Sequence, residues 1–141
     1  MDLLFTIAGI RRRAVLEVNT LGPLRMIEAF AESLARGERK LAVTLTSGMG
    51  SIGDNTSGGW IAYRTSKAAV NMAVKCAAIR LAPRRIKCIV INPGWVRTDM
   101  GGAHAPLSAE ESVAAMRRVF ESIGPSDSGE FFNHDGHRYP W

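Results

Sequence analysis

Three side chains near the middle of the sequence have types and spacing that suit proton transfer at a carbonyl oxygen. Tyr63 and Lys67 are four residues apart, so they share one face if this segment is helical. A tyrosine phenol ordinarily has a pKa of about 10, and an ammonium group one helical turn away favours the phenolate. Such a tyrosine can protonate a developing alkoxide, while the Ser47 hydroxyl bonds the same substrate oxygen. This chemistry suits hydride transfer from a bound nicotinamide.

Each of these residues also has an ordinary structural explanation. The tyrosine could be an amphipathic core residue, the lysine a solvated charge and the serine a turn residue. A Tyr-x-x-x-Lys pair by itself is weak evidence for a site. The catalytic interpretation is favoured because the residues occur in the right order on a strand end, a helix and the next strand end.

The predicted elements bring these residues to one edge of a sheet. Residues 41–46 and 86–91 are apolar without strict alternation, which is typical of strands covered on both faces. Residues 60–81 form a long helical pattern between them. This order predicts an α/β fold with a Rossmann-like parallel sheet and flanking helices. Ligands bind beyond the carboxyl ends of such strands, so the loops 47–59 and 92–107 are expected at the site.

Further elements extend this unit at both ends. Apolar residues at helical spacing predict a helix over residues 14–35, which Gly22-Pro23 either kinks or divides. A capping box at Ser108-Ala109-Glu110-Glu111 predicts a helix that ends near residue 122. Apolar segments over residues 3–8 and 129–132 predict two short strands.

Length and composition are those of one packed domain. The chain has 141 residues, of which 46% are hydrophobic, and a formal net charge of +5. Its basic residues lie in small scattered groups without interleaved aromatic residues, which argues against nucleic-acid binding. No apolar run approaches the roughly 20 residues of a membrane-spanning helix. Two cysteines, Cys76 and Cys88, are too few for a disulfide framework, and a cytoplasmic protein is expected.

Several motifs resemble the short-chain dehydrogenase/reductase family. Within this family, the chain is most similar to the C-factor and sniffer-type carbonyl reductases. The matching segments are Thr46-Ser47-Gly48-Met49-Gly50-Ser51-Ile52-Gly53-Asp54, Tyr63-Arg64-Thr65-Ser66-Lys67, Asn92-Pro93-Gly94-Trp95-Val96-Arg97-Thr98 and Tyr139-Pro140-Trp141.

The resemblance implies a role for each matching residue. Tyr63 would donate and accept the proton, Lys67 would assist it and hold the nicotinamide ribose, and Ser47 would orient the substrate carbonyl. Asn19 is similar to a helix asparagine that supports a water-mediated proton relay, although an asparagine before Gly-Pro is also typical of a turn or cap. The implied cofactor is NADP, with NAD as the alternative. The residues that would contact its nicotinamide end, besides Tyr63 and Lys67, are Pro93, Gly94, Val96 and Thr98.

The glycine-rich turn that binds the cofactor pyrophosphate in this family is missing from the sequence. Gly48, Gly50 and Gly53 fit a Gly-x-Gly-x-x-Gly pattern after a strand, but residues 54–59 separate this pattern from the next helix. Residues 1–141 are therefore interpreted as one partial domain, the carboxyl-terminal portion of the family fold. Two functions fit: an NAD(P)-dependent oxidoreductase acting on a small carbonyl compound or alcohol, or a non-catalytic remnant that acts through protein association.

Two weaker signals concern metals and assembly. His134-Asp135-Gly136-His137 offers too few ligands for a metal site and is better explained as a solvated tail, so no metal is predicted. The two long helices could form a homodimer face, as the resemblance implies, or pack on the chain's own sheet. The sequence does not distinguish these arrangements.

Overall fold

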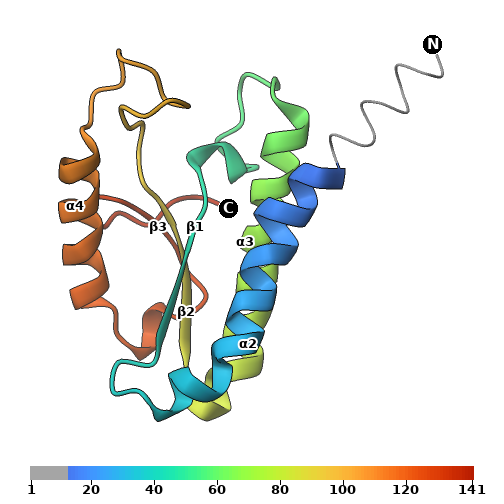
Figure 1. Ribbon diagram of the computed structural model, residues 1–141, viewed down its shortest axis with the longest axis vertical. Coiled ribbons are helices and arrows are strands. Elements are labelled where there is room, and N and C mark those ends of the chain that lie inside the picture. Colours follow the sequence, from blue (N-terminus) through green and yellow to red (C-terminus); the bar gives the residue numbers. More distant parts are fainter. Residues whose placement is uncertain (1–12) are drawn as a thin grey trace.

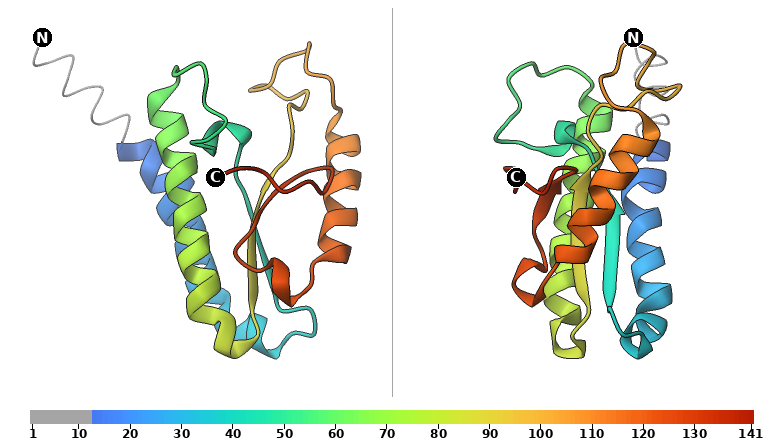
Figure 2. Two further views of the ribbon diagram at one scale, coloured as in Figure 1. Left: turned by 180° about the vertical axis from the view of Figure 1, so that it is seen from behind. Right: turned by 90° about the vertical axis from the view of Figure 1, so that its left-hand side faces the viewer.

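The computed structural model describes residues 13–141, and these form three layers (Figure 1). The middle layer is a parallel sheet in the order β1-β2-β3. Two helices, α2 and α3, cover one face, and α4 covers the other (Figures 1 and 2). The predicted α/β class with a parallel sheet is confirmed, while the strand predicted over residues 3–8 lies outside the described residues. The elements are α2 (Gly22–Arg36), β1 (Leu41–Leu45), α3 (Ile61–Leu81), β2 (Lys87–Asn92), α4 (Ala109–Ser122) and β3 (Phe131–Asn133).

The position of β2 in the middle of the sheet explains why its sequence does not alternate between apolar and polar residues. It pairs with β1 on one side, Val43 opposite Ile89, and with β3 on the other, Val90 opposite Phe131. Successive side chains point to opposite faces of a strand. Val90 therefore packs toward α2 and α3, whereas Ile89 packs toward α4, and both are fully buried.

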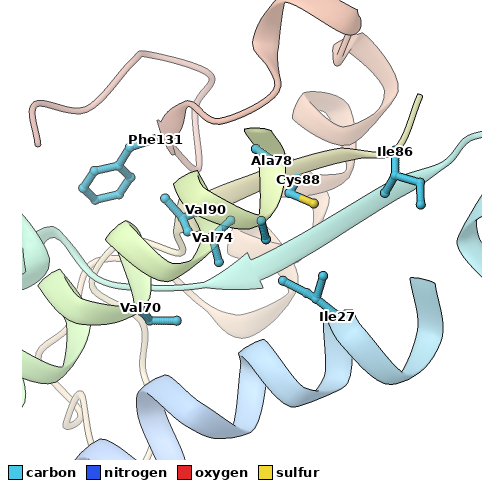
Figure 3. Packing of buried hydrophobic residues seen from close by; sticks show 9 residues of the cluster. Ile27, Val70, Val74, Ala78, Ile86, Cys88, Val90 and Phe131 are labelled. Carbon is cyan, nitrogen blue, oxygen red and sulfur yellow. The ribbon is translucent and has the colours of Figure 1, made fainter. Parts of the chain in front are cut away.

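Two apolar cores hold the layers together. The larger core joins α2 and α3 to the sheet around Val70, Val74 and Phe131 (Figure 3). The second core joins α4 to the sheet around Met116 and Val119. Each large aliphatic or aromatic side chain buried in this way contributes about 1.5–3 kcal/mol, so these cores fix the positions at which α3 and α4 begin.

The first long helix is continuous and contains a π turn over Glu17–Leu21. The main-chain N–H of Gly22 donates to the carbonyl of Glu17, five residues earlier. Pro23 follows and has no N–H to donate, so the wider turn accommodates it without ending the helix. The sequence left open a kink or a fresh start here, and the structure has a continuous helix with one enlarged turn.

The remaining predicted boundaries agree with the structure to within about two residues. The capping box is present, since the Ser108 main-chain N–H donates to Glu111 Oε2 at 2.7 Å and the Glu111 N–H donates to Ser108 Oγ at 3.1 Å. The strand predicted at 129–132 is shifted to Phe131–Asn133. Throughout residues 13–141, each helix is too short or too polar to cross a bilayer.

Candidate active site

The carboxyl ends of β1 and β2 point to the same edge of the sheet, at the top of Figure 1. The loop 46–60 follows β1 and the loop 93–108 follows β2. Helix α3 also begins at this edge. The side chains predicted to act together are therefore carried by segments that leave one edge, as expected for a parallel sheet.

Ser47 lies where the chain leaves β1 and turns into a short 3₁₀ helix over Gly48–Gly50. Its backbone is extended, with φ −159° and ψ 150°. Its Oγ accepts a hydrogen bond from the main-chain N–H of Met49 at 3.1 Å. Since a hydroxyl both accepts and donates, this bond orients Ser47 Oγ and leaves its O–H free to donate.

The segment that carries Ser47 is packed tightly against α3. Thr46 Oγ1 donates to Asn71 Oδ1 at 2.6 Å, and Asn71 Nδ2 donates to the carbonyl of Gly50 at 3.4 Å. A Cβ added to Gly50 would lie only 2.9 Å from the Lys67 Cβ. Only glycine permits this approach, so the Ser47 segment is held against the helical turn of Lys67.

Tyr63 and Lys67 face one another on α3 as their spacing predicts. Lys67 Nζ lies 5.8 Å from the centroid of the Tyr63 ring and donates to the carbonyl of Leu45 at 3.2 Å. Burial lowers the pKa of Lys67, because removal from water disfavours the ammonium form. The ammonium keeps two further N–H donors beside the one bonded to β1. The two side chains and the end of β1 thus form one polar group at the sheet edge.

Asn19 lies in the π turn and is linked to α3 through Ser66. Asn19 Nδ2 donates to Ser66 Oγ at 3.1 Å, and Ser66 Oγ donates to the carbonyl of Tyr63 at 2.8 Å. Thr20 Oγ1 also donates to the carbonyl of Ser66, at 2.9 Å. The enlarged turn therefore places Asn19 beside Ser66, whose hydroxyl links it to the backbone of Tyr63. Single π turns within helices are frequent at functional sites.

The residues predicted to contact the nicotinamide end lie in the loop after β2. Pro93 accepts a hydrogen bond at its carbonyl from Ser112 Oγ on α4, at 2.7 Å. Gly94 has φ +82°, which favours glycine. Val96 forms an isolated bridge with Leu107, and Thr98 Oγ1 accepts from the N–H of Gly101 at 3.1 Å.

The contacts of this second group differ from those of the first. Among the described residues, its hydrogen bonds run to α4 and within its own loop. The structure thus brings Tyr63 and Lys67 together, and it packs the segment that carries Ser47 against the turn of Lys67 through Gly50. It brings the second group only to the same edge of the sheet.

Sequence reasoning missed two buried polar residues that organise the site. Ser66 and Asn71 are at most 2% exposed, yet each bonds to a second segment as described above. The sequence did contain a signal for these two residues, because both lie on the helical face that carries the apolar residues Val70 and Val74. A polar side chain on a core-facing stripe usually has a specific bonding partner.

His137 of the tail is exposed and pairs with a neighbouring carboxylate. His137 Nδ1 lies 3.2 Å from Asp135 Oδ1, and both side chains are accessible to solvent. In the part of the chain that the structure describes, His, Cys, Asp and Glu do not gather in groups of three that could hold a metal ion.

Comparison with known proteins gives a consistent result. The model of the short chain dehydrogenase family matches residues 6–107. The C-signal protein of Myxococcus xanthus is 45% identical over 124 residues, which cover 88% of this chain and 75% of that protein. A 1-hydroxy-2-glutathionyl-2-methyl-3-butene dehydrogenase of Rhodococcus sp. is 38% identical and covers 92% of this chain and 58% of its own length.

Solved structures agree with this result. Carbonyl reductase Sniffer of D. melanogaster has a TM-score of 0.84 at 36% identity, covering 89% of this chain and 55% of its own. An NADPH-bound carbonyl reductase from chicken fatty liver has a TM-score of 0.85 at 33% identity, covering 92% of this chain and 57% of its own. The chain thus spans a little over half the length of these reductases. Because the family match extends over most of the chain and includes the tyrosine, lysine and serine segments, the chain belongs to the short-chain dehydrogenase/reductase family.

Proposed function

We propose that this chain carries the proton-transfer site of an NADP-dependent carbonyl reductase, with Tyr63, Lys67 and Ser47 as its catalytic residues. The observation that carries the proposal is the position of Lys67 Nζ, 5.8 Å from the Tyr63 ring centroid, on the helical turn against which the Ser47 segment packs. Membership in a family of oxidoreductases supports it.

Each residue would have a distinct role in reduction. The Tyr63 phenol donates its proton to the carbonyl oxygen as negative charge develops there. The Ser47 hydroxyl, whose oxygen is already oriented by the Met49 N–H, donates a hydrogen bond to the same oxygen. The Lys67 ammonium stabilises the phenolate that remains. Asn19 acts indirectly, because it donates to Ser66 Oγ, which in turn donates to the Tyr63 carbonyl.

The residues present fit the nicotinamide-ribose end of the cofactor. Lys67 has N–H donors to spare for the ribose hydroxyls, and Pro93, Gly94, Val96 and Thr98 would hold the carboxamide and the adjacent phosphate from the loop after β2. Bound NADPH supplies the hydride for the carbonyl carbon.

The preference for NADP over NAD follows from relatives. The chicken reductase has NADPH bound, and a short-chain dehydrogenase/reductase structure from Burkholderia multivorans, 36% identical with a TM-score of 0.76, has NADP bound. The substrate class is a small carbonyl compound, or the corresponding alcohol in the reverse direction.

The first experiment replaces the phenol alone. In Tyr63→Phe we expect kcat for reduction of aldehydes and ketones, followed as loss of NADPH absorbance, to fall by about 100-fold or more, as for loss of a general acid. NADPH affinity from a fluorescence titration should stay within about twofold. Unchanged turnover would refute the role of Tyr63, and absence of saturable NADPH binding by the wild type would favour the non-catalytic alternative.

The second experiment uses a matched pair of lysines. Lys67 and Lys87 each donate from Nζ to one main-chain carbonyl at 3.2 Å. Both Lys67→Met and Lys87→Met therefore remove one bond of the same kind. We expect Lys67→Met to weaken NADPH binding and to lower kcat, while Lys87→Met retains both.

Assembly and compartment are also part of the proposal. The exposed faces of α2 and α3 carry large apolar side chains at helical spacing, Met26 with Phe30 and Met72 with Ile79. We infer that these faces form a homodimer, which light scattering of Phe30→Glu and the wild type would test. Both Cys76 and Cys88 are free thiols, which supports a reducing compartment such as the cytoplasm.

A further inference from the structure

The last residues of the chain lie against the loop that follows Ser47, and in Figure 1 the chain ends beside the short helix at Gly48–Gly50. We call residues 138–141 the strap. We propose that the strap holds the loop after Ser47 in its working position, with Tyr139 as the positioning residue. The effect on turnover rests on the proposed reductase function, whereas the effect on the loop does not.

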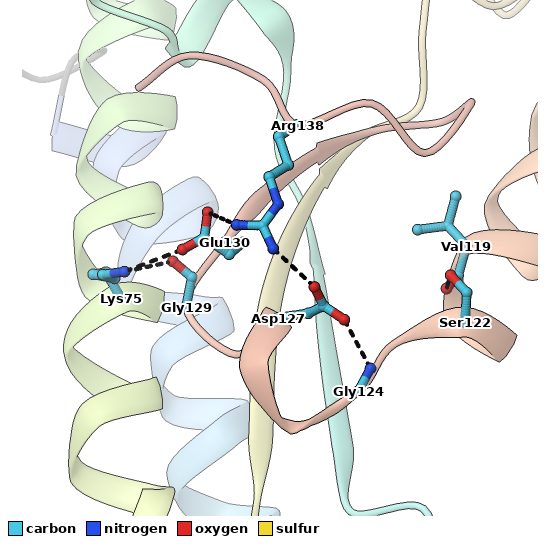
Figure 4. Close-up of polar contacts among 8 residues, drawn as sticks. All are labelled: Lys75, Val119, Ser122, Gly124, Asp127, Gly129, Glu130 and Arg138. Carbon is cyan, nitrogen blue, oxygen red and sulfur yellow. Dashed lines mark hydrogen bonds and ion pairs between the residues drawn. The ribbon is translucent and has the colours of Figure 1, made fainter.

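The strap is anchored firmly on the sheet side. Arg138 forms ion pairs with Asp127 at 3.0 Å and with Glu130 at 2.9 Å (Figure 4). Lys75 on α3 donates to the carbonyl of Gly129 at 3.0 Å, beside the same cluster. These contacts connect the start of the strap to α3 and to the segment before β3, so the strap does not depend on the loop for its own position.

The ring of Tyr139 packs against the larger core, which adds to the anchoring of the strap by Arg138. Its centroid lies 4.9 Å from that of Phe131, and the Tyr139 main-chain N–H donates to the Phe131 carbonyl at 2.7 Å. The Trp141 ring also lies against Phe131, with centroids 5.7 Å apart. Phe131 is 1% exposed, so both strap rings rest on a rigid part of the sheet.

The free end of the strap bonds the loop at three points. Tyr139 Oη donates to Asp54 Oδ2 at 3.0 Å. The main-chain oxygen of Trp141 accepts from the N–H of Gly53 at 2.8 Å and from Ser51 Oγ at 3.3 Å. Ser51 Oγ in turn accepts from the N–H of Asp54 at 3.0 Å. The bond from the Gly53 N–H involves the loop backbone directly, and the Ser51 hydroxyl links the strap to the Asp54 backbone, so these bonds fix the path of the loop.

Tyr139 also limits the backbone immediately after Ser47. A Cβ added to Gly48 would lie 2.7 Å from Tyr139 Oη, so the phenol rests against the bare backbone of this residue. The neighbouring Met49 N–H is the donor that orients Ser47 Oγ. Displacement of the phenol would free Gly48, and with it the Met49 amide. The contact between Tyr139 and Gly48 therefore influences Ser47 through the adjoining main chain.

The Tyr139 phenol is a dependable donor over the ordinary pH range. Burial, together with the nearby Asp54 carboxylate, raises its pKa, so the proton needed for the bond remains in place. A hydrogen bond from a neutral phenol to a carboxylate is stronger than one between neutral groups. This bond is consequently the best single target for a test.

The test compares Tyr139→Phe, which keeps the ring on Phe131, with the wild type by amide hydrogen exchange measured by NMR. We expect the Met49, Gly53 and Asp54 amides to exchange at least tenfold faster in the variant, while the Met116 amide in α4 is unchanged. Asp54→Ala should reproduce this result, and Asp54→Asn, which retains an acceptor oxygen, should restore slow exchange. His137→Ala serves as the control, because its side chain is 85% exposed and outside the strap.

Turnover gives the second readout. With the reductase active, Tyr139→Phe should lower kcat by about tenfold with the KM for NADPH unchanged, and Asp54→Asn should retain the wild-type kcat. Equal exchange of the Met49 amide in Tyr139→Phe and the wild type would overturn the proposal. If the wild type lacks reductase activity while amide exchange changes as expected, the proposed reductase function is refuted and the proposal for the strap is supported. If Tyr139→Phe does not fold, Asp54→Ala and removal of Trp141 test the same bonds from the other side.

Discussion

The two loops at the carboxyl edge of the sheet are held by arginines that belong to different parts of the molecule. The loop 46–60 is held by Arg64, which projects from α3 and donates to the carbonyl of Gly59 at 2.9 Å and to Ser57 Oγ at 2.8 Å. The helix that carries Tyr63 and Lys67 therefore also holds the loop that carries Ser47. These groups form one rigid unit, which suits the fixed geometry that the proposed proton transfer would require.

The loop 93–108 is held by an arginine of its own. Arg97 donates to the carbonyls of Ala105 and Pro106 at 2.9 and 2.8 Å. Trp95 Nε1 donates to the carbonyl of Gly101 at 2.8 Å, although the Trp95 side chain is 59% exposed. A loop with internal bonds of this kind can shift as a unit and keep most of them. The first loop is thus bonded to α3, the helix of the proposed catalytic residues, whereas the second loop is bonded to itself and, through Pro93 and Arg97, to α4. We therefore expect the second loop to adapt more readily to what binds.

The largest expected effect comes from crowding the first loop against α3. In Gly50→Ala the new Cβ would press on the Lys67 Cβ at 2.9 Å and on the Lys67 backbone at 3.0 Å, so we expect a loss of about 2–3 kcal/mol in the free energy of unfolding. Gly59→Ala is the control, because its Cβ would meet open space. Urea unfolding measures both, and equal midpoints would show that the loop is not fixed to the helix.

A smaller effect is expected from a buried bond of the first loop. Thr46→Val removes the donor to Asn71 Oδ1 and leaves this buried oxygen unpaired, at a cost of about 1–2 kcal/mol. Thr98→Val in the second loop removes an exposed hydroxyl and should cost less than about 0.5 kcal/mol. Thermal or urea unfolding of the two variants compares the loops directly, and a reversed order would contradict the comparison.

The two arginines give a third test, in local dynamics. We expect Arg64→Ala to speed amide exchange at Gly59, since its contacts to the loop are lost, and to lower kcat because the Ser47 segment loosens. Arg97→Ala should speed exchange near Ala105 and leave the loop 46–60 unchanged. NMR exchange rates report both changes. Coupled loosening of both loops by either variant would show that they are one unit.

The smallest expected effect is a dependence of the second loop on pH. The main-chain N–H of Ser108 and the charge of Arg97 lower the pKa of the Glu111 carboxyl. Its folded-state pKa lies below the ordinary value of about 4.5, so its stabilising contribution is complete above that value and is lost as the pH falls through the lowered pKa. Exchange near Ala105, taken relative to the intrinsic exchange rate, should therefore rise slightly in the wild type as the pH falls through this lowered pKa. Glu111→Gln should show no such rise.

Much of the fold could be predicted because its signals are local. The capping box at Ser108 and the apolar run 88–91 within β2 each report directly on their own environment. The i, i+4 spacing likewise placed Tyr63 and Lys67 on one face. The roles of Ser47, Tyr63, Lys67 and Asn19 in catalysis stay predictions, as does the binding of cofactor by the loop after β2.

The parts that could not be predicted depend on contacts between distant segments. Ser66 meets Asn19 across 47 positions, and Tyr139 meets Asp54 across 85. Sequence patterns over one helix or strand do not encode such distances. The π turn was also missed, because Gly22-Pro23 is typical of a break and the widened turn depends on Asn19 finding Ser66 on a neighbouring helix.

The π turn over Glu17–Leu21 determines what a one-residue deletion would do. The turn adds one residue to an otherwise regular α-helix. Deletion of one residue here would restore ordinary α-helical winding and rotate Asn19 away from Ser66. The core around Val70 and Val74 would survive such a deletion. A single deletion in this turn is therefore expected to remove the proposed support by Asn19 and to leave the fold intact.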